Sequence, residues 1–100
     1  MSRKTEKFHT FDAARYLDSP EALAEFVSDA LETGDVAYIA HALGIVARAK
    51  GVAQMASETG LSREQLYRSF SEKGNPTLKT LLAVTRSLGI DMAAKPRLSH

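Results

Sequence analysis

Residues 52–74 read VAQMASETGLSREQLYRSFSEKG and decide the fold of this chain. The pattern predicts a short helix, a tight turn and a second helix. Gly60 is placed to end the first helix, because glycine enters the left-handed backbone region at little steric cost. Ser62 can cap the second helix with its hydroxyl, and Gln65, three residues on, can return a bond to the cap. Together these features predict a helix-turn-helix over residues 52–73.

The second helix of the motif has one apolar and one charged face. Leu66 and Phe70 lie one turn apart and are expected to be buried, as is Leu61 just before the helix. The helical step then puts Glu64 and Arg68 on the outer face. In a helix-turn-helix, the first turn of this helix enters the major groove of DNA. The sequence therefore points to DNA binding, and the alternative is a solvated amphipathic helix in an unrelated bundle.

Length and composition fit a small binding module. One hundred residues make one domain, which can bury about two-thirds of its unfolded surface. Cysteine is absent, which excludes a disulfide framework, a thiolate metal site and a thiol nucleophile. No apolar run approaches the roughly eighteen residues that cross a bilayer, and the polar start lacks the apolar segment of a signal peptide. We expect a soluble, cytoplasmic protein that does not contact membranes.

Residues for catalysis or metal binding do not gather anywhere in the sequence. His9, His41 and His100 are scattered, and none has a carboxylate or a second histidine at ligand spacing. The glycines fall at helix ends, except Gly44, which lies inside a predicted helix and is expected to permit close packing. We therefore expect no enzymatic activity, no metal and no cofactor.

Charge is divided unevenly along the chain. Residues 1–45 carry four Lys and Arg against eight Asp and Glu, a net charge of −4. Residues 46–100 carry nine against four, a net charge of +5. The basic half contains the helix-turn-helix, as binding to DNA phosphates requires. The alternative is an ordinary surface of mixed charges.

Cap residues and first-turn prolines open the other predicted helices. They are Asp12 for a short turn to Leu17, Ser19-Pro20 for a helix to Gly34, Asp35 for a helix to about Lys50, and Asn75-Pro76 for a last helix that Gly89 stops. The side chains expected to face inward are Leu23, Phe26, Val27, Ala30 and Leu31, then Val36, Ile39, Ala40, Leu43, Val46 and Ala47, and finally Leu78, Leu81, Leu82, Thr85 and Leu88.

The resulting expectation is an all-α fold of about five helices. Residues 1–10 form a flexible tail, and residues 11–100 form a single helical domain. After the last helix, Ile90, Met92 and Ala94 alternate with more polar neighbours. That alternation leaves two readings open, a short strand or a packed tail.

Several stretches resemble one protein family. They are GLSREQLYRSFSEKGNPTL at 60–78, LLAVTRSLGI at 81–90, and upstream FDAARYL at 11–17, ALETGD at 30–35 and ALGIVARAKG at 42–51. The run closely resembles the antidote (antitoxin) proteins of bacterial addiction modules, which carry a Cro/phage-repressor-type helix-turn-helix. The resemblance covers roughly Phe11 to Met92. One departure is Ser69, where the broader repressor superfamily usually has a larger apolar residue.

The resemblance implies a lambda-repressor-like DNA-binding domain with an N-terminal helical extension. It also implies a dimer that neutralises a co-encoded toxin of the RelE/ParE fold and represses their shared promoter on double-stranded operator DNA. A phage-type or host regulator that acts alone, with no toxin partner, is the first alternative. The second is a toxin-neutralising module that no longer binds DNA.

The candidate DNA contacts divide into two classes. Those expected to read bases are Arg63, Glu64 and Arg68, at positions that match the superfamily's base-reading positions, and those expected to contact the DNA backbone are Gln54, Ser62, Tyr67, Asn75, Thr77 and Lys79. Arginine suits guanine O6 and N7, and glutamate suits cytosine N4. Backbone N–H groups at helix starts can hold a phosphate. The alternatives are charge pairing on the surface, capping alone for Ser62, Asn75 and Thr77, and half-buried packing for Tyr67.

Two protein partners are expected. A single recognition helix reads about half a site, so we expect a homodimer, with Leu88, Ile90 and Met92 as its interface. The alternative for these three residues is packing into the monomer's own core. The acidic half, with helices over residues 12–33, is expected to face the toxin, because toxins that act on RNA are usually basic.

Overall fold

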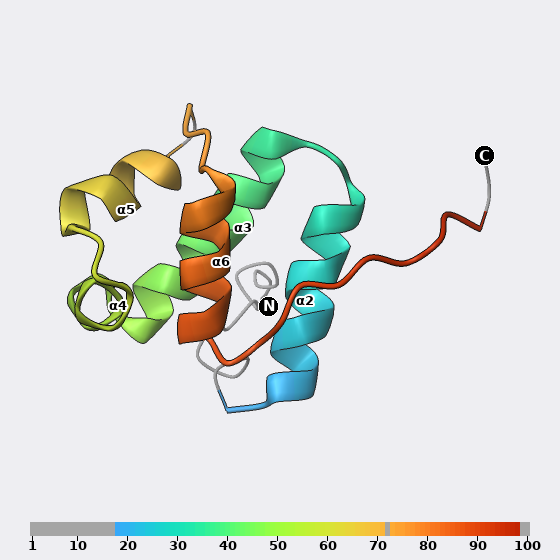
Figure 1. The fold of residues 1–100 in the computed structure, drawn as a ribbon, viewed down its shortest axis with the longest axis horizontal. Helices are drawn as coiled ribbons and strands as arrows, with labels where there is room; N and C mark the ends of the chain where they lie inside the picture. The colour runs from blue at the N-terminus through green and yellow to red at the C-terminus, as the bar shows by residue number, and fades with distance from the viewer. Residues whose placement is uncertain (1–17, 72, 99–100) are drawn as a thin grey trace, which may run out of the picture.

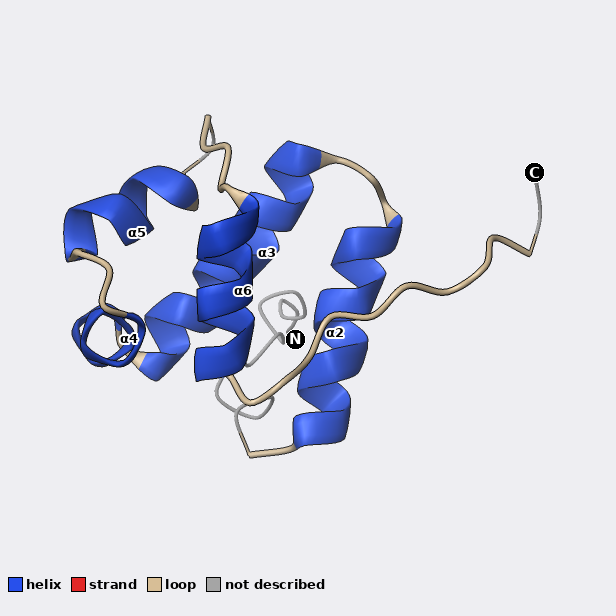
Figure 2. Ribbon diagram, in the orientation of Figure 1, coloured by secondary structure: helices blue, strands red, loops and turns tan. Residues whose placement is uncertain are grey.

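The computed structural model describes residues 18–71 and 73–98, and these residues form five α-helices. The helices are α2 (Pro20–Glu32), α3 (Val36–Lys50), α4 (Val52–Thr59), α5 (Arg63–Ser69) and α6 (Leu78–Ser87). Figure 2 shows helices joined by loops, with no strand in the described part of the chain. The expected all-α class is confirmed. The predicted tail over residues 1–10 and the short turn after Asp12 lie outside the described residues.

The predicted starts of α2 and α3 are confirmed at atomic level. Ser19 caps α2, and its hydroxyl accepts a hydrogen bond from the Ala22 amide at 3.2 Å, with Pro20 in the first turn. Asp35 caps α3, and its carboxylate accepts from the amides of the second and third helical residues at 3.0 and 3.2 Å. Short polar caps therefore fix where each helix begins.

The core lies where α2 packs on α3 and where α4 packs against α3, α5 and α6 (Figure 1). Its buried side chains are Leu23, Val27, Leu43, Val46, Ala47, Met55, Leu66, Phe70 and Val84. Gly44 in α3 lies under Phe70, and a Cβ atom there would be 3.2 Å from the Phe70 carbonyl oxygen and 3.3 Å from its Cβ. The expected close packing at Gly44 is confirmed, and it lets the end of α5 approach α3 directly.

The start of α6 differs from the sequence expectation. Asn75 and Pro76 do not open the helix, because Thr77 is its cap and accepts a hydrogen bond from the Thr80 amide at 3.1 Å. Residues 75–76 instead belong to the loop from α5. The cap two residues later is the one whose hydroxyl reaches a free amide of the first turn.

Three leucine or valine side chains expected inside are exposed. Leu78 is 64% exposed and Leu82 is 44% exposed, because α6 turns Leu81, Val84 and Thr85 toward the core instead. Leu82 follows Leu81 by one helical step of about 100° and so points away. Val36, at the first position of α3, is also exposed. Burial of a side chain is thus predicted less well by its being leucine than by its angular position on the helix.

The segment after α6 forms no strand up to residue 98, and it packs against the core only near its start, whereas residues 93–98 are exposed. The Ile90 amide donates to the Thr85 carbonyl at 3.0 Å, and Leu88 and Ile90 pack partly buried against the core. The tail then crosses α2 (Figure 1), where Lys95 forms an ion pair with Glu32. Within residues 18–71 and 73–98, no single helix is long and apolar enough to cross a membrane, and α3 with α4 meets that test only as a pair bent by 100°.

Candidate nucleic-acid interface

The turn between α4 and α5 has the geometry that its sequence predicts. Gly60 ends α4 in the left-handed conformation, with φ of 79°. The Ser62 hydroxyl accepts from the Gln65 amide at 3.0 Å, and the Gln65 side chain accepts from the Ser62 amide at 2.9 Å. This capping box fixes the direction in which α5 leaves the turn.

The outer face of α5 carries charged side chains that the core does not use. Leu66 is 1% exposed and Phe70 is 6% exposed, whereas Arg63, Glu64 and Arg68 are all exposed. The ion pairs between described residues are Lys50–Glu58 and Lys95–Glu32, so none of them engages these three side chains. Among the described residues these side chains have no ion-pair partner, and the face carries both donors and an acceptor of the kind that can bond base edges.

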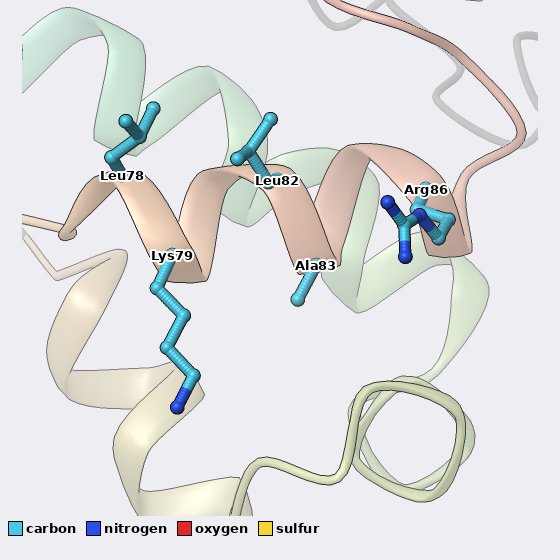
Figure 3. A pocket seen from close by; sticks show the side chains of 5 residues that line it. All are labelled: Leu78, Lys79, Leu82, Ala83 and Arg86. Atoms are coloured by element: carbon cyan, nitrogen blue, oxygen red, sulfur yellow. The ribbon is translucent and has the colours of Figure 1, made fainter.

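A hollow of about 570 Å³ lies between α5, the following loop and the start of α6. Arg68, Lys73 and Lys79 line it, together with Asn75 and Thr77. Figure 3 shows the Lys79 side chain extending from α6 toward α5. Three cations and the start of a helix thus line one concave surface, which suits a phosphate backbone.

Gly74 shapes the loop that forms one wall of this hollow. Its amide donates to the Ser71 carbonyl at 2.8 Å, and a Cβ atom on Gly74 would lie 2.2 Å from the Ser69 carbonyl oxygen. No side chain fits at that distance. The loop can therefore fold back on the end of α5 only with glycine at this position.

The other predicted backbone contacts are not brought into the hollow. Ser62 is occupied as the cap of α5, and Gln54 donates from α4 to Glu58 Oε2 at 3.1 Å. Tyr67 is exposed and borders a separate apolar hollow of about 210 Å³ between α3 and α5. These three side chains lie on α4, its turn and α5, while Asn75, Thr77 and Lys79 share the hollow with Arg68.

Exposed apolar side chains include Leu78 and Leu82 on α6 and, in the tail, Leu98. Leu88 and Ile90 already pack against the monomer's core, and Met92 is half-buried. Leu78 and Leu82 line a shallow hollow of about 470 Å³ with Lys79, Ala83 and Arg86 (Figure 3). Two exposed leucines one turn apart form an uncovered apolar stripe.

A polar cluster that the sequence did not reveal joins three helices. We call it the Lys50 clip, and its members are Lys50, Gln54, Glu58 and Ser87. Lys50 Nζ lies 2.7 Å from Glu58 Oε1, and the Ser87 hydroxyl donates to the same oxygen at 2.7 Å. Hydrogen bonds from Lys50, Ser87 and Gln54 lower the pKa of the Glu58 carboxyl from 4.5 to about 2, and the bond from Lys50 has the largest effect. Ser87 lies 29 residues from Glu58 and 37 from Lys50, so no local spacing brings it into the cluster.

Within the part of the chain that the structure describes, no three His, Asp or Glu side chains gather in a way that could hold a metal ion.

A family model described as "Probable addiction module antidote protein" matches residues 7–96. An uncharacterized protein of Haemophilus influenzae is 37% identical over 86 residues, which are 86% of this chain and 89% of that protein. No solved structure matches the chain significantly. Antidotes are regulatory proteins with a cognate toxin as partner, not enzymes. The chain belongs to the family of probable addiction module antidote proteins.

Proposed function

We propose that this antitoxin neutralises a co-encoded toxin of the RelE/ParE fold and represses their shared promoter by binding operator DNA in the cytoplasm. One observation carries the DNA-binding half of the proposal. The exposed face of α5, with Arg63, Glu64 and Arg68, adjoins a hollow lined by three cations. Base reading and phosphate binding need such neighbouring surfaces.

The base contacts belong to α5. The capping box holds the first turn of this helix, which carries Arg63 and Glu64, and burial of Leu66 holds its inner side. Arg68 lies at the boundary between the helix face and the hollow, because it is exposed on α5 and also lines the hollow. We therefore assign base contacts to Arg63, Glu64 and Arg68, and phosphate contacts to Asn75, Thr77 and Lys79. Gln54, Ser62 and Tyr67 remain proposed backbone contacts at the margin.

The toxin surface is proposed on the acidic side of the molecule. Glu21, Glu25 and Asp29 are exposed along α2. A toxin that binds RNA carries a basic surface, so these carboxylates would steer its approach. This half of the proposal rests on charge complementarity and on the antidote family's need for a toxin partner.

A homodimer is proposed because one α5 helix reads only half a site. The sequence-based candidates Leu88, Ile90 and Met92 adjoin the end of α6, and all three are already partly buried in the monomer. We therefore extend the proposed interface to Leu78 and Leu82, whose side chains the core leaves exposed.

The test is binding to the DNA upstream of the chain's own gene, measured by fluorescence anisotropy. Arg68→Ala should weaken specific binding about tenfold to a hundredfold, because one base-reading pair contributes about 1–3 kcal/mol. Arg97→Ala removes the same charge from the exposed tail and serves as the matched control. Equal affinity of the two variants would remove Arg68 from the base contacts.

Lys79→Ala tests the phosphate assignment in the same assay. Loss of one phosphate contact should weaken binding to operator and unrelated DNA alike and should lower the slope of log affinity against log salt by about one. A loss confined to the operator would show that Lys79 reads sequence instead.

A further inference from the structure

The Lys50 clip ties together the ends of three helices at one point. Lys50 is in the last turn of α3, Glu58 is on α4, and Ser87 ends α6. The Lys50 ammonium donates to the Ser87 carbonyl oxygen and, at 3.2 Å, to the Ser87 hydroxyl. It therefore satisfies an unpaired carbonyl at the end of α6 while it neutralises the carboxylate on α4.

The clip is only partly sheltered from solvent, and its geometry is fixed by several hydrogen bonds to one carboxylate. The Lys50 side chain is 16% exposed and the Glu58 side chain is 39% exposed. Glu58 accepts hydrogen bonds from Lys50 and Ser87 on one oxygen and from Gln54 on the other. A carboxylate with several charge-assisted or neutral donors is oriented more strictly than one with a single exposed partner.

The two DNA-facing elements are related to each other through α4. Both α5 and α6 pack against α4 and contact one another little. The proposed base contacts lie on α5, and the proposed phosphate contact Lys79 lies near the start of α6. Ser87 is eight residues from Lys79 along α6, a distance of about 12 Å, so a rotation at the clip moves Lys79 relative to α5.

We propose that the Lys50 clip positions α6 on α4, so that the base-contacting face of α5 and the phosphate-contacting start of α6 meet one DNA site together. Lys50, Glu58 and Ser87 are then positioning residues that touch no DNA. This inference rests on the proposed DNA binding.

The direction in which one substitution changes DNA affinity distinguishes a positioning role from an electrostatic one. Glu58→Gln removes a negative charge, so long-range electrostatics alone would strengthen DNA binding. Positioning instead requires weaker operator binding, by about threefold to thirtyfold, with a smaller change for unrelated DNA. Glu32→Gln is the matched control, because it removes the same charge and also breaks an ion pair, the one with Lys95.

The measurement is operator and non-operator affinity well below the melting temperature of each variant, so that loss of stability alone does not contribute. Lys50→Met should weaken operator binding as Glu58→Gln does, and Lys50→Arg, which keeps a charged donor, should restore most of it. Operator affinity of Glu58→Gln equal to or above that of Glu32→Gln would overturn the proposal.

A second readout needs no DNA. The chain has no cysteine, so Tyr67→Cys on α5 and Lys79→Cys on α6 provide two exposed sites for spin labels outside the proposed dimer interface. Adding Glu58→Gln should shift or broaden the label-to-label distance distribution measured by electron resonance, and adding Glu32→Gln should not. An unchanged distribution would refute the clip. Failure of the wild-type chain to bind its upstream DNA would instead refute the proposed function and leave this distance to judge the clip.

Discussion

At Glu58 one carboxylate accepts hydrogen bonds from three side chains, and these bonds hold its pKa near 2. A group whose pKa is lower in the folded state stabilises the fold above its unfolded pKa and loses that contribution as pH falls toward the folded pKa. For Glu58 this window runs from about pH 4.5 down to about pH 2.

Glu58→Gln should therefore be less stable than the wild-type chain at pH 7, and the two should converge as the pH falls to about 2. Urea unfolding between pH 7 and pH 2 measures the difference. In a Lys50→Met background the pH dependence of this difference should flatten, because the main donor is missing. A difference that stays constant over the whole range would contradict the assigned hydrogen bonds.

Local sequence signals predict the structural roles of some residues fully and the roles of others not at all. The cap at Ser62 and the glycine at Gly60 act within four residues, so the sequence predicts the turn and the direction of α5. The Lys50 clip depends on helix packing that brings Lys50 to Ser87, and no spacing rule contains that information.

At the scale of elements, α6 shows why boundaries are harder to predict than helices. Two cap signals compete before it, Asn75 followed by proline and Thr77 followed by leucine. The loop that folds back at Gly74 uses residues 75–76 to reach α6, which leaves Thr77 as the cap. The sequence predicts that α6 exists, while its first residue depends on this loop and the exposure of Leu82 depends on how α6 is rotated about its axis.

The same loop gives a prediction for Gly74→Ala. The added methyl would meet the Ser69 carbonyl, so the loop must move, at a cost of about 1–3 kcal/mol or more in unfolding free energy. Because this loop lines the cationic hollow, operator affinity should fall as well.

Gly89→Ala is the comparison variant for this experiment. Gly89 has a positive φ and open space around it, at the opposite end of α6 from the hollow. The Gly89→Ala variant should lose about 1–2 kcal/mol of unfolding free energy because of backbone strain, and it should lose little operator affinity. Chemical denaturation and anisotropy report the two effects, and equal losses of affinity would rule out a special role for the loop at Gly74.

At the scale of the whole molecule, the acidic and basic surfaces should serve different partners. Glu25→Lys on α2 should slow association with the co-encoded toxin about tenfold at low salt and should not weaken operator binding. Glu64→Lys on α5 makes the same charge change and should alter operator binding alone. Stopped-flow mixing at two salt concentrations measures the rates. Normal toxin association by the Glu25 variant would place the toxin surface elsewhere.

The dimer proposal is tested by light scattering at several protein concentrations. Leu82→Asp puts a charge on the exposed stripe of α6 and should split the dimer without unfolding the chain, because Leu82 is 44% exposed in the monomer. Met92→Asp is the companion variant on the half-buried tail. If only Met92→Asp dissociates the dimer, the interface lies on the tail. A wild-type chain that is monomeric and binds DNA as one copy would refute the proposed dimer.

Gly44 lies where α3 meets the end of α5. A Cβ atom added at this position would lie 3.2 Å from the Phe70 backbone oxygen. A smaller side chain at position 70 cannot relieve that contact, since the opposing atom is main chain. In evolutionary terms, position 44 is therefore coupled to the path of the backbone after α5 and not to core volume. An alignment of relatives should show glycine at 44 wherever the segment from Phe70 to Gly74 keeps its length, and other residues at 44 should coincide with insertions, deletions or altered operators.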